Sequence, residues 1–382
     1  MAGTAWTRRL APVAIVAIGA GCGGRTDAAA PGPIASEQAT FELVTVVAGL
    51  EHPWGMAFLP NEDILITERP GRLRVVRDGV LDPAPIAGVP EVYASGQGGL
   101  LDVALDPEFA SNGLIYLSYA AEGDGGNSTR VARARLDGGR LENLEVIFMA
   151  EPPARSSKHF GSRLAFDPEG YLFITVGERD RRDRAQDLGA DNGSVIRLHP
   201  DGRVPADNPL VGTAGARPEI FSYGHRNAQG LAIHPETGIP WLHEHGARGG
   251  DEVNVVRPGV NYGWPVITYG IDYSGAPIGE GTHKDGMAQP IYYWVPSIAP
   301  SGMAFYQGDA FPEWQGDLFV GALRSELLAR LELDGEQVIA EERLLEGAIG
   351  RIRDVETGPD GFLYLLTDES DGGLYRLEPA QG

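Results

Sequence analysis

Short apolar runs of about 4–8 residues alternate along the chain with turns rich in Gly, Pro, Asp and Asn. From about residue 42 onward, the spacing of three to four residues that marks an amphipathic helix is nearly absent. The pattern therefore predicts an all-β fold.

One arrangement of apolar and polar positions recurs. An apolar strand is followed by a turn, often built on Asp-Pro, His-Pro or Leu-Pro, then by a second apolar strand and a third that ends in charge. The copies begin at Trp54, Leu100, Ser162, Gln229, Ser301 and Val355. Their spacing of roughly 45 to 75 residues is typical of propeller blades with variable loops.

These copies predict a six-bladed β-propeller over residues 41–382, because one blade cannot bury both faces of its sheet and a ring of blades can. The last copy ends in LYRLEP at residues 374–379, close to the C-terminus. We therefore expect terminal strands to pair and close the ring. A pair of β-sandwiches is the alternative fold, but it would not explain the repeated unit.

The N-terminus has the pattern of an export signal. Two arginines precede an apolar run over residues 10–20, which is too short to span a bilayer, and Cys22, the single cysteine, follows. We expect residues 1–22 to be a lipoprotein signal with Cys22 acylated, and residues 23–40 to be a flexible tether. The protein would then be periplasmic or anchored to the outer membrane. An ordinary cleaved signal with an incidental cysteine is the alternative.

Composition narrows the choice of partner. The 382 residues carry a formal net charge of -22, with 42% hydrophobic and 22% charged residues. These fractions are those of an ordinary globular protein, and the length suits one large all-β domain or two ordinary ones. So acidic a surface repels phosphate backbones, which argues against nucleic acid as a partner and is compatible with calcium.

Several polar residues interrupt the repeat just before or after an apolar strand, where the loops of a propeller converge. They are Gln97, His159, Arg226, Asn227, Arg324, Arg351 and Arg353. Arginines from separate blades that face one place repel each other unless an anion lies between them, so this set predicts a polyanionic ligand. The alternative is that each arginine pairs locally with an Asp or Glu of this acidic chain.

Residues 223–264 contain several candidate ligand-binding groups within one stretch of the chain. Arg226 and Asn227 end a turn before a short apolar strand at residues 230–233, and a Gly-rich acidic loop follows at residues 245–252. An arginine, an amide and a loop of free oxygens can hold an anionic cofactor and a hard cation side by side. A strand, a turn and a solvated acidic loop are the alternative interpretation.

The same residues lie in motifs that resemble the soluble pyrroloquinoline quinone (PQQ)-dependent sugar dehydrogenases, and more closely their bacterial aldose sugar dehydrogenase branch. The motifs are GQGGLLDVALDP at residues 96–107, KHFGSRLAFDP at 158–168, YGHRNAQGLA at 223–232, GDEVNVVRPGVNYGWP at 250–265, PSIAPSGMAFY at 296–306 and GRIRDVETGPDGFLYLLTD at 350–368. Each is weak alone, but together they cover the body after the tether in the order of the repeat. The resemblance implies a six-bladed propeller that binds PQQ over a calcium ion, oxidises the C1 hydroxyl of aldoses to a lactone and passes electrons to an external acceptor.

The resemblance also implies roles for single residues. His159 matches the catalytic base, a neutral imidazole that takes the C1 hydroxyl proton while a hydride moves to the quinone. Arg226 matches an arginine that stabilises negative charge on the quinone oxygens. The other residues implied in cofactor binding are Gln97, Asn227, Tyr273, Ala322, Leu323, Arg324, Arg351, Ile352 and Arg353. The guanidinium groups among them suit the PQQ carboxylates.

Two groups of oxygen ligands are implied for calcium. Gly246 and Ala247 match a loop whose main-chain carbonyls hold the cation, and Glu252 and Tyr262 match positions linked to calcium in the aldose branch. Whether they form one site or two stays open. A surface carboxylate in a salt bridge is the alternative for Glu252.

The chain departs from the glucose-specific branch of that family. Lys158 stands where that branch has Asp, and Val295 where it has Trp, so glucose specificity is not carried over. Arg324 replaces a Lys and keeps its charge, and Ala247 replaces a Pro at a main-chain ligand. Shorter loops predict an open site and a broad range of aldoses. We expect a monomer or a weak dimer.

Two other functions stay open on the residues alone. A calcium-dependent propeller lactonase or hydrolase would use the cation to polarise a carbonyl, and a non-catalytic propeller would bind glycans at the cell surface. Convergent arginines favour the dehydrogenase, because a lactonase needs no clamp for a tricarboxylate. A binding module has no reason to hold His159 beside Arg226.

Overall fold

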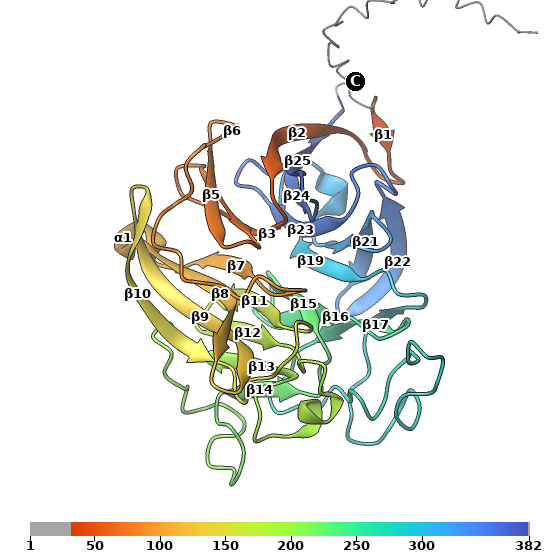
Figure 1. Ribbon diagram of the computed structural model, residues 1–382. Coiled ribbons are helices and arrows are strands. Elements are labelled where there is room, and N and C mark those ends of the chain that lie inside the picture. The colour runs from red at the N-terminus through yellow and green to blue at the C-terminus, as the bar shows by residue number, and fades with distance from the viewer. Residues whose placement is uncertain (1–31, 381–382) are drawn as a thin grey trace, which may run out of the picture.

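The computed structural model describes residues 32–380 as six antiparallel sheets arranged around a common axis (Figure 1). From the inside outward, blade 1 contains β3 (Pro53–Phe58), β4 (Ile64–Glu68), β5 (Arg72–Arg77) and β6 (Val80–Leu81); blade 2 contains β7 (Leu100–Leu105), β8 (Leu114–Gly123), β9 (Gly126–Asp137) and β10 (Arg140–Met149); and blade 3 contains β11 (Gly161–Phe166), β12 (Leu172–Val176), β13 (Ser194–Leu198) and β14 (Ile220–Tyr223). Blade 4 contains β15 (Ala228–Ile233), β16 (Pro240–Glu244), β17 (Asp251–Val255) and β18 (Tyr292–Trp294); blade 5 contains β19 (Pro300–Phe305), β20 (Leu318–Ala322), β21 (Leu327–Asp334) and β22 (Gln337–Leu344); and blade 6 contains β23 (Ile352–Thr357), β24 (Leu363–Thr367), β25 (Gly372–Pro379), β2 (Thr40–Leu50) and β1 (Ile34–Ala35). The predicted all-β, six-bladed propeller is confirmed.

Helical structure in residues 32–380 is limited to three short segments. These are α1 (Phe109–Asn112) and the 3-10 helices η1 (Arg182–Gln186) and η2 (Pro312–Trp314). No helix in this part of the chain has the length and hydropathy needed to cross a membrane.

The six innermost strands form a closed ring. β3, β7, β11, β15, β19 and β23 contact one another in this order, and β23 also contacts β3. In every blade, the register between the innermost strand and the next one shifts near the start of the innermost strand. Such irregularities redirect side chains out of the ladder. They lie at the end of the ring where the residues predicted for the site are found.

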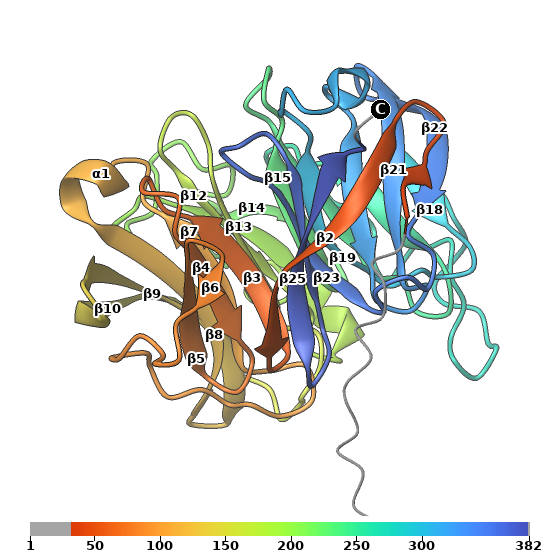
Figure 2. The ribbon, with the colours of Figure 1, turned by 90° about the horizontal axis from the view of Figure 1, so that it is seen from above.

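The N-terminal strand β2 completes the last blade. It pairs antiparallel with β25, Phe41 lying opposite Pro379, and the two strands lie side by side in both views (Figures 1 and 2). The predicted closure by terminal strands is therefore confirmed. Within the predicted tether, Ile34–Ala35 pairs with β2 as β1. The predicted signal peptide, with Cys22, lies outside the described residues.

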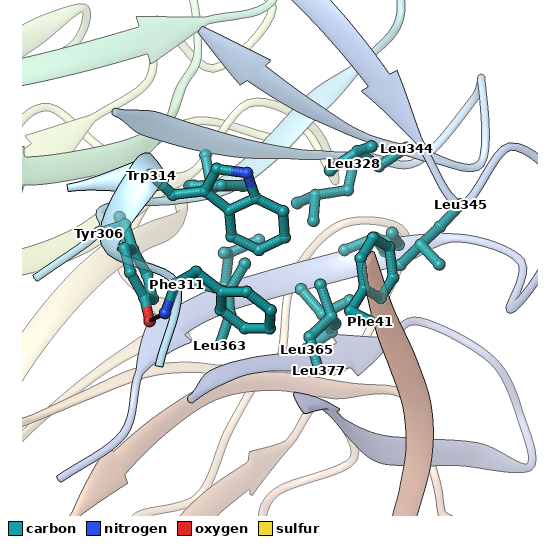
Figure 3. Packing of buried hydrophobic residues seen from close by; sticks show 14 of the residues in the cluster. Phe41, Tyr306, Phe311, Trp314, Leu328, Leu344, Leu345, Leu363, Leu365 and Leu377 are labelled. Atoms are coloured by element: carbon teal, nitrogen blue, oxygen red, sulfur yellow. Dashed lines mark hydrogen bonds between the residues drawn. The ribbon is translucent and has the colours of Figure 1, made fainter. Parts of the chain in front are cut away.

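The closing strand also contributes to a core between blades 5 and 6. Phe41 packs edge-on against Trp314 with 5.8 Å between ring centroids, and Phe311 stacks on the same tryptophan at 4.2 Å (Figure 3). Leu363 and Leu377 are buried in the same cluster. Burial of these side chains stabilises the closed ring by an amount on the order of several kcal/mol.

Contacts of the buried Arg163 side chain join four blades at the axis, three of them through ion pairs. Arg163 on β11 forms ion pairs with Asp102 on β7 at 3.2 Å and with Asp354 on β23 at 2.7 Å. Its guanidinium also lies 4.1 Å from the ring centroid of Trp54 on β3. Burial raises the pKa of Asp102 to about 6, although the charge of Arg163 opposes the shift. The arginine therefore keeps two buried carboxylates from facing each other uncompensated.

Candidate cofactor site and active site

Most of the residues predicted for the site lie at one end of the ring. Some precede an innermost strand, as His159 precedes β11 and Arg226 precedes β15, and others follow the second strand of a blade, as Arg324 follows β20. The first two strands of each blade are antiparallel, so the start of one and the end of the other share the same end of the sheet. The topology therefore explains why residues from separate blades converge.

His159 is buried and held on two sides. Its backbone N–H donates to Oε1 of Gln97 at 2.7 Å, and its Nδ1 lies 2.9 Å from Oε1 of Glu178. A carboxylate at Nδ1 keeps a proton on that nitrogen and leaves the Nε2 lone pair free. Burial lowers the pKa of His159 below its usual 6.5; the hydrogen bond with Glu178 opposes this shift, and the charge of Arg226 adds to it. The ring is therefore neutral near pH 7.

Glu178, which the sequence analysis did not identify, is the partner of this histidine. Burial raises its pKa, but the hydrogen bond with His159 and the charges of His159 and Arg226 outweigh burial and hold the pKa below its usual range. Its second oxygen accepts the backbone N–H of Arg181 at 3.0 Å. One feature of the sequence could have identified Glu178: it lies in GERD, where a carboxylate directly follows the second apolar strand of a blade.

Arg179 clamps the loop that carries His159. Its guanidinium donates to the main-chain carbonyls of Lys158 and Ser156, the latter at 2.7 Å, and lies 3.4 Å from the ring centroid of Phe160. His159 and Arg179 have φ angles of 54° and 62°. Non-glycine residues adopt positive φ at a cost, so neighbouring contacts must hold them there. The clamp fixes the backbone before and after the histidine.

Arg226 carries a buried positive charge without an acidic partner for its guanidinium. Nη1 donates to the carbonyls of Gly246 at 2.6 Å and His245 at 3.2 Å, and the guanidinium forms no ion pair within the described residues. It lies 5.2 Å from the ring centroid of Trp264. The backbone N–H of Arg226 donates to Glu244, which fixes the turn. A guanidinium so placed can compensate charge on an anionic ligand.

An amide and an arginine continue the cluster across the ring. Oδ1 of Asn227 accepts the N–H of Gly161 at 3.1 Å, while its Nδ2 is buried without a hydrogen-bond partner in residues 32–380. Arg353 donates to Oε1 of Gln229 at 3.0 Å and to Oδ2 of Asp368 at 2.7 Å. A buried free N–H is a donor kept for another partner. Asn227 therefore has the property expected of a ligand-binding amide.

Two further arginines lie in loops of blades 5 and 6. Arg351 donates to the carbonyl of Leu323 at 3.2 Å and is 3.9 Å from Asp368. Arg324 is exposed, and its side chain forms no hydrogen bond or ion pair in the part of the chain that the structure describes. Local pairing therefore accounts for Arg353 but not for Arg226 or Arg324.

Three predicted cofactor residues are placed differently. Ala322 and Ile352 are fully buried in the cores beside blade 5, so they contribute packing and main-chain atoms. Tyr273 is 70% exposed, and its side chain forms no hydrogen bond within residues 32–380. The structure does not join Tyr273 to the cluster, and its role stays a prediction.

The first predicted calcium group lies next to Arg226. The N–H of Gly246 donates to Oδ1 of Asp251 at 2.9 Å, and the Gly246 carbonyl accepts the arginine. Ala247, the next residue, is buried. Main-chain oxygens of this loop therefore lie beside the guanidinium, where an anion and a cation can both be held.

In the second predicted group, Glu252 and Tyr262, the carboxylate of Glu252 has an acidic neighbour that was not predicted, Glu244. Glu252 on β17 lies opposite Glu244 on β16. Burial and the charge of Glu244 raise the pKa of Glu252 well above its usual range. Glu252 forms no ion pair in residues 32–380, so the structure does not support the salt-bridge alternative. A cation or a proton relieves the repulsion between such carboxylates.

Tyr262 can offer calcium its main-chain oxygen only. Its hydroxyl donates to the carbonyl of Val255 at 2.6 Å and accepts the N–H of Arg257 at 2.9 Å. No group of three or more acidic, His or Cys side chains in the described residues forms a metal site by itself. Carbonyl oxygens would therefore have to complete the coordination of any ion here.

These features define a class of protein: a six-bladed propeller with a buried His–Glu pair beside uncompensated arginines at the end of its ring. The family model for glucose/sorbosone dehydrogenase matches residues 50–376. The chain belongs to this family.

Individual relatives agree with this assignment. Aldose sugar dehydrogenase YliI of Escherichia coli is 48% identical over 347 residues, covering 89% of this chain and 94% of that protein. A crystal structure of a glucose dehydrogenase superposes with a TM-score of 0.87 at 53% identity, covering 88% and 99% of the two chains. The PQQ-bound aldose sugar dehydrogenase of Streptomyces coelicolor superposes with a TM-score of 0.73 at 30% identity, covering 89% and 99%.

Proposed function

We propose that this protein oxidises the C1 hydroxyl of aldoses to a lactone, with PQQ and calcium as cofactors. The observation that carries the proposal is the placement of the neutral His159, backed by Glu178, beside the uncompensated Arg226. Both the Escherichia coli and the Streptomyces coelicolor relatives are named aldose sugar dehydrogenases, which supports dehydrogenation of an aldose, and the Streptomyces coelicolor structure is a PQQ-bound form, which supports the quinone.

The residues present fit PQQ. Arg226 and Arg324 lack acidic partners, and Nδ2 of Asn227 is a buried donor without a partner in residues 32–380. Arg351 and Arg353 both lie beside Asp368, whose single charge balances one of the two. These groups would hold its carboxylates and quinone oxygens. When bound, PQQ supplies the two-electron oxidant that takes a hydride from C1 of the sugar.

His159 acts as the base in this proposal. Nε2 accepts the proton of the C1 hydroxyl, while Nδ1 keeps its proton toward Glu178. The carboxylate then stabilises the imidazolium that forms, and Gln97 and Arg179 keep the loop in place. A positioned base of this kind contributes about 10²–10⁴-fold to the rate.

For calcium we propose oxygens of the two predicted groups. Glu252, with Glu244 opposite, supplies negative charge, and the carbonyls of Gly246, Ala247 and Tyr262 supply neutral ligands. Such a mixture of carboxylate and carbonyl oxygens suits a hard divalent cation.

One assay tests the proposal. Purified protein is mixed with PQQ and Ca²⁺, an aldose is added, and bleaching of a redox dye is followed. We expect bleaching that requires both cofactors. If the folded protein fails to bleach the dye with every aldose tried, the dehydrogenase function is contradicted. Lactone hydrolysis, measured alongside, would then identify the hydrolase instead.

We also infer that the chain is exported and anchored through Cys22, because an apolar run ends at this single cysteine. Fractionation of cells tests this. Cys22→Ser should move the protein from the membrane fraction to a soluble one, and an unchanged distribution would contradict the anchor.

A further inference from the structure

A pocket that the proposed function does not use lies between blades 2 and 3. Its volume is about 560 Å³, and it is lined by Tyr93, Ser95, Glu122, Gly123, Gly126, Asn127, Arg155, Ser156 and Ser157. These residues come from the loop before β7, the hairpin between β8 and β9, and the loop before β11. We call it the rim pocket.

The rim pocket shares a wall with the site of His159. The carbonyl of Ser157 accepts the N–H of Gln97 at 2.8 Å, and Oε1 of Gln97 accepts the N–H of His159 at 2.7 Å. Asn127 and Ser156, also in the pocket wall, both accept hydrogen bonds from Arg179, the clamp of the histidine loop. The pocket is therefore one residue layer away from the proposed base.

The lining suits a neutral, hydroxyl-rich ligand. Glu122 and Arg155 are exposed, and neither side chain forms a hydrogen bond or ion pair in residues 32–380. The charges of Glu122 and Arg155 sum to zero, so the pocket favours neither an anion nor a cation. The carboxylate and the guanidinium each have hydrogen-bonding capacity for two hydroxyl groups. The half-buried ring of Tyr93 adds an apolar face of the kind that packs on a sugar ring.

A second pocket extends the first. It has a volume of about 520 Å³ and shares Tyr93, Ser95 and Glu122 with the rim pocket. The residues that it adds, among them Val92, Ala121 and Arg130, come from the loop before β7 and from β8 and β9, so blade 2 supplies the whole lining of the second pocket.

We propose that the rim pocket binds the non-reacting ring of a di- or oligosaccharide whose reducing end reaches His159. The inference rests on the proposed function for the reacting end only. The rim pocket is a subsite that the catalytic residues do not require. Glu122 and Arg155, whose side chains have no partner in residues 32–380, then determine the length of the sugar that binds.

Binding to a sugar that cannot react tests the subsite apart from catalysis. Methyl β-maltoside has no free C1 hydroxyl, so calorimetry with the protein measures binding alone. We expect binding by the wild type and at least tenfold weaker binding by the Glu122→Gln/Arg155→Gln double variant. Arg140→Gln changes an exposed arginine on the outer strand of blade 2 and is the matched control.

Kinetics with PQQ and Ca²⁺ give a second readout. The ratio of kcat/KM for maltose to kcat/KM for glucose should fall about tenfold in the double variant, equal to 1.4 kcal/mol, and stay constant in the control. Absence of binding by the wild type, or equal effects on both sugars, would overturn the subsite. Binding without oxidation of any aldose would refute the proposed function and leave the subsite standing.

Discussion

Oε1 of Glu178 lies 2.9 Å from Nδ1 of His159, and both side chains are buried. Each group changes the pKa of the other: Glu178 raises that of the histidine against the effect of burial, and the histidine lowers that of the glutamate. The pair sets both the tautomer and the basicity of the proposed base.

The first prediction concerns this pair. Glu178→Gln should lower kcat on the order of 10²-fold, because the imidazolium loses its counter-charge. Since Glu178 raises the pKa of His159, its removal should lower that pKa, and the acid limb of the pH–kcat profile should move to lower pH. In the wild type this limb should already lie below pH 6.5. An acid limb that moves upward, or an unchanged kcat, would contradict the pairing.

The second prediction concerns the clamp. Arg179→Met removes the donors to the carbonyls of Lys158 and Ser156, and each carbonyl left unpaired costs about 1–3 kcal/mol. We expect a lower melting temperature and a kcat reduced by at least tenfold, with PQQ affinity changed much less. Added guanidinium ion at low concentration should restore part of kcat in Arg179→Ala. A variant with wild-type kcat would show that the clamp does not position the base.

The third prediction concerns the axis. Arg163→Leu should lower the free energy of unfolding by about 3–5 kcal/mol, because Asp102 and Asp354 then face each other without a cation. Both carboxyls have folded pKa values raised above their usual 3.8, and loss of Arg163 raises them further. A raised carboxyl pKa removes stability as pH rises through the folded pKa. The loss of unfolding free energy caused by Arg163→Leu should therefore be smaller near pH 5 than near pH 8.

Chemical denaturation at the two pH values measures this difference. Arg203→Leu, which breaks an exposed pair with Asp201, is the control and should change stability by less than about 0.5 kcal/mol. A deficit for Arg163→Leu that is independent of pH would mean that the carboxylates do not depend on this arginine.

The fourth prediction concerns calcium. A ligand at a hundredfold excess over its Kd stabilises the fold by about 2.7 kcal/mol, so chelation should lower the melting temperature by a few degrees. Glu252→Gln should remove this calcium-dependent shift, whereas Glu336→Gln, at an exposed pair with Arg257, should keep it. Equal shifts in both variants would place any calcium elsewhere.

The blades could be predicted from sequence because each begins with the same pair of apolar strands. The copies of the repeat that begin at Trp54 and Ser162 show this pattern. His159, Arg226 and Arg353 stand out because they interrupt that pattern beside strands. Their meeting follows from topology, since every innermost strand begins at the same end of the ring.

Other contacts depend on three-dimensional closure and had no local signal. Glu178 meets His159 only because β12 returns beside β11. Arg163, Asp102 and Asp354 come from three blades and meet only when the ring closes. For Arg163 and Asp102 the one trace in the sequence is a charged residue inside a largely apolar strand, as in SRLAF and LDVAL. Such a charge predicts a buried partner without naming it.

The most direct test of the central claim is reduction of bound PQQ by an aldose in a single turnover, followed by its absorbance. Wild-type protein loaded with PQQ and Ca²⁺ should reduce the cofactor within seconds. His159→Gln should bind PQQ with similar affinity and reduce it at least about 10²-fold more slowly. Reduction at the wild-type rate in His159→Gln, or failure of the folded wild type to bind PQQ, would contradict the account.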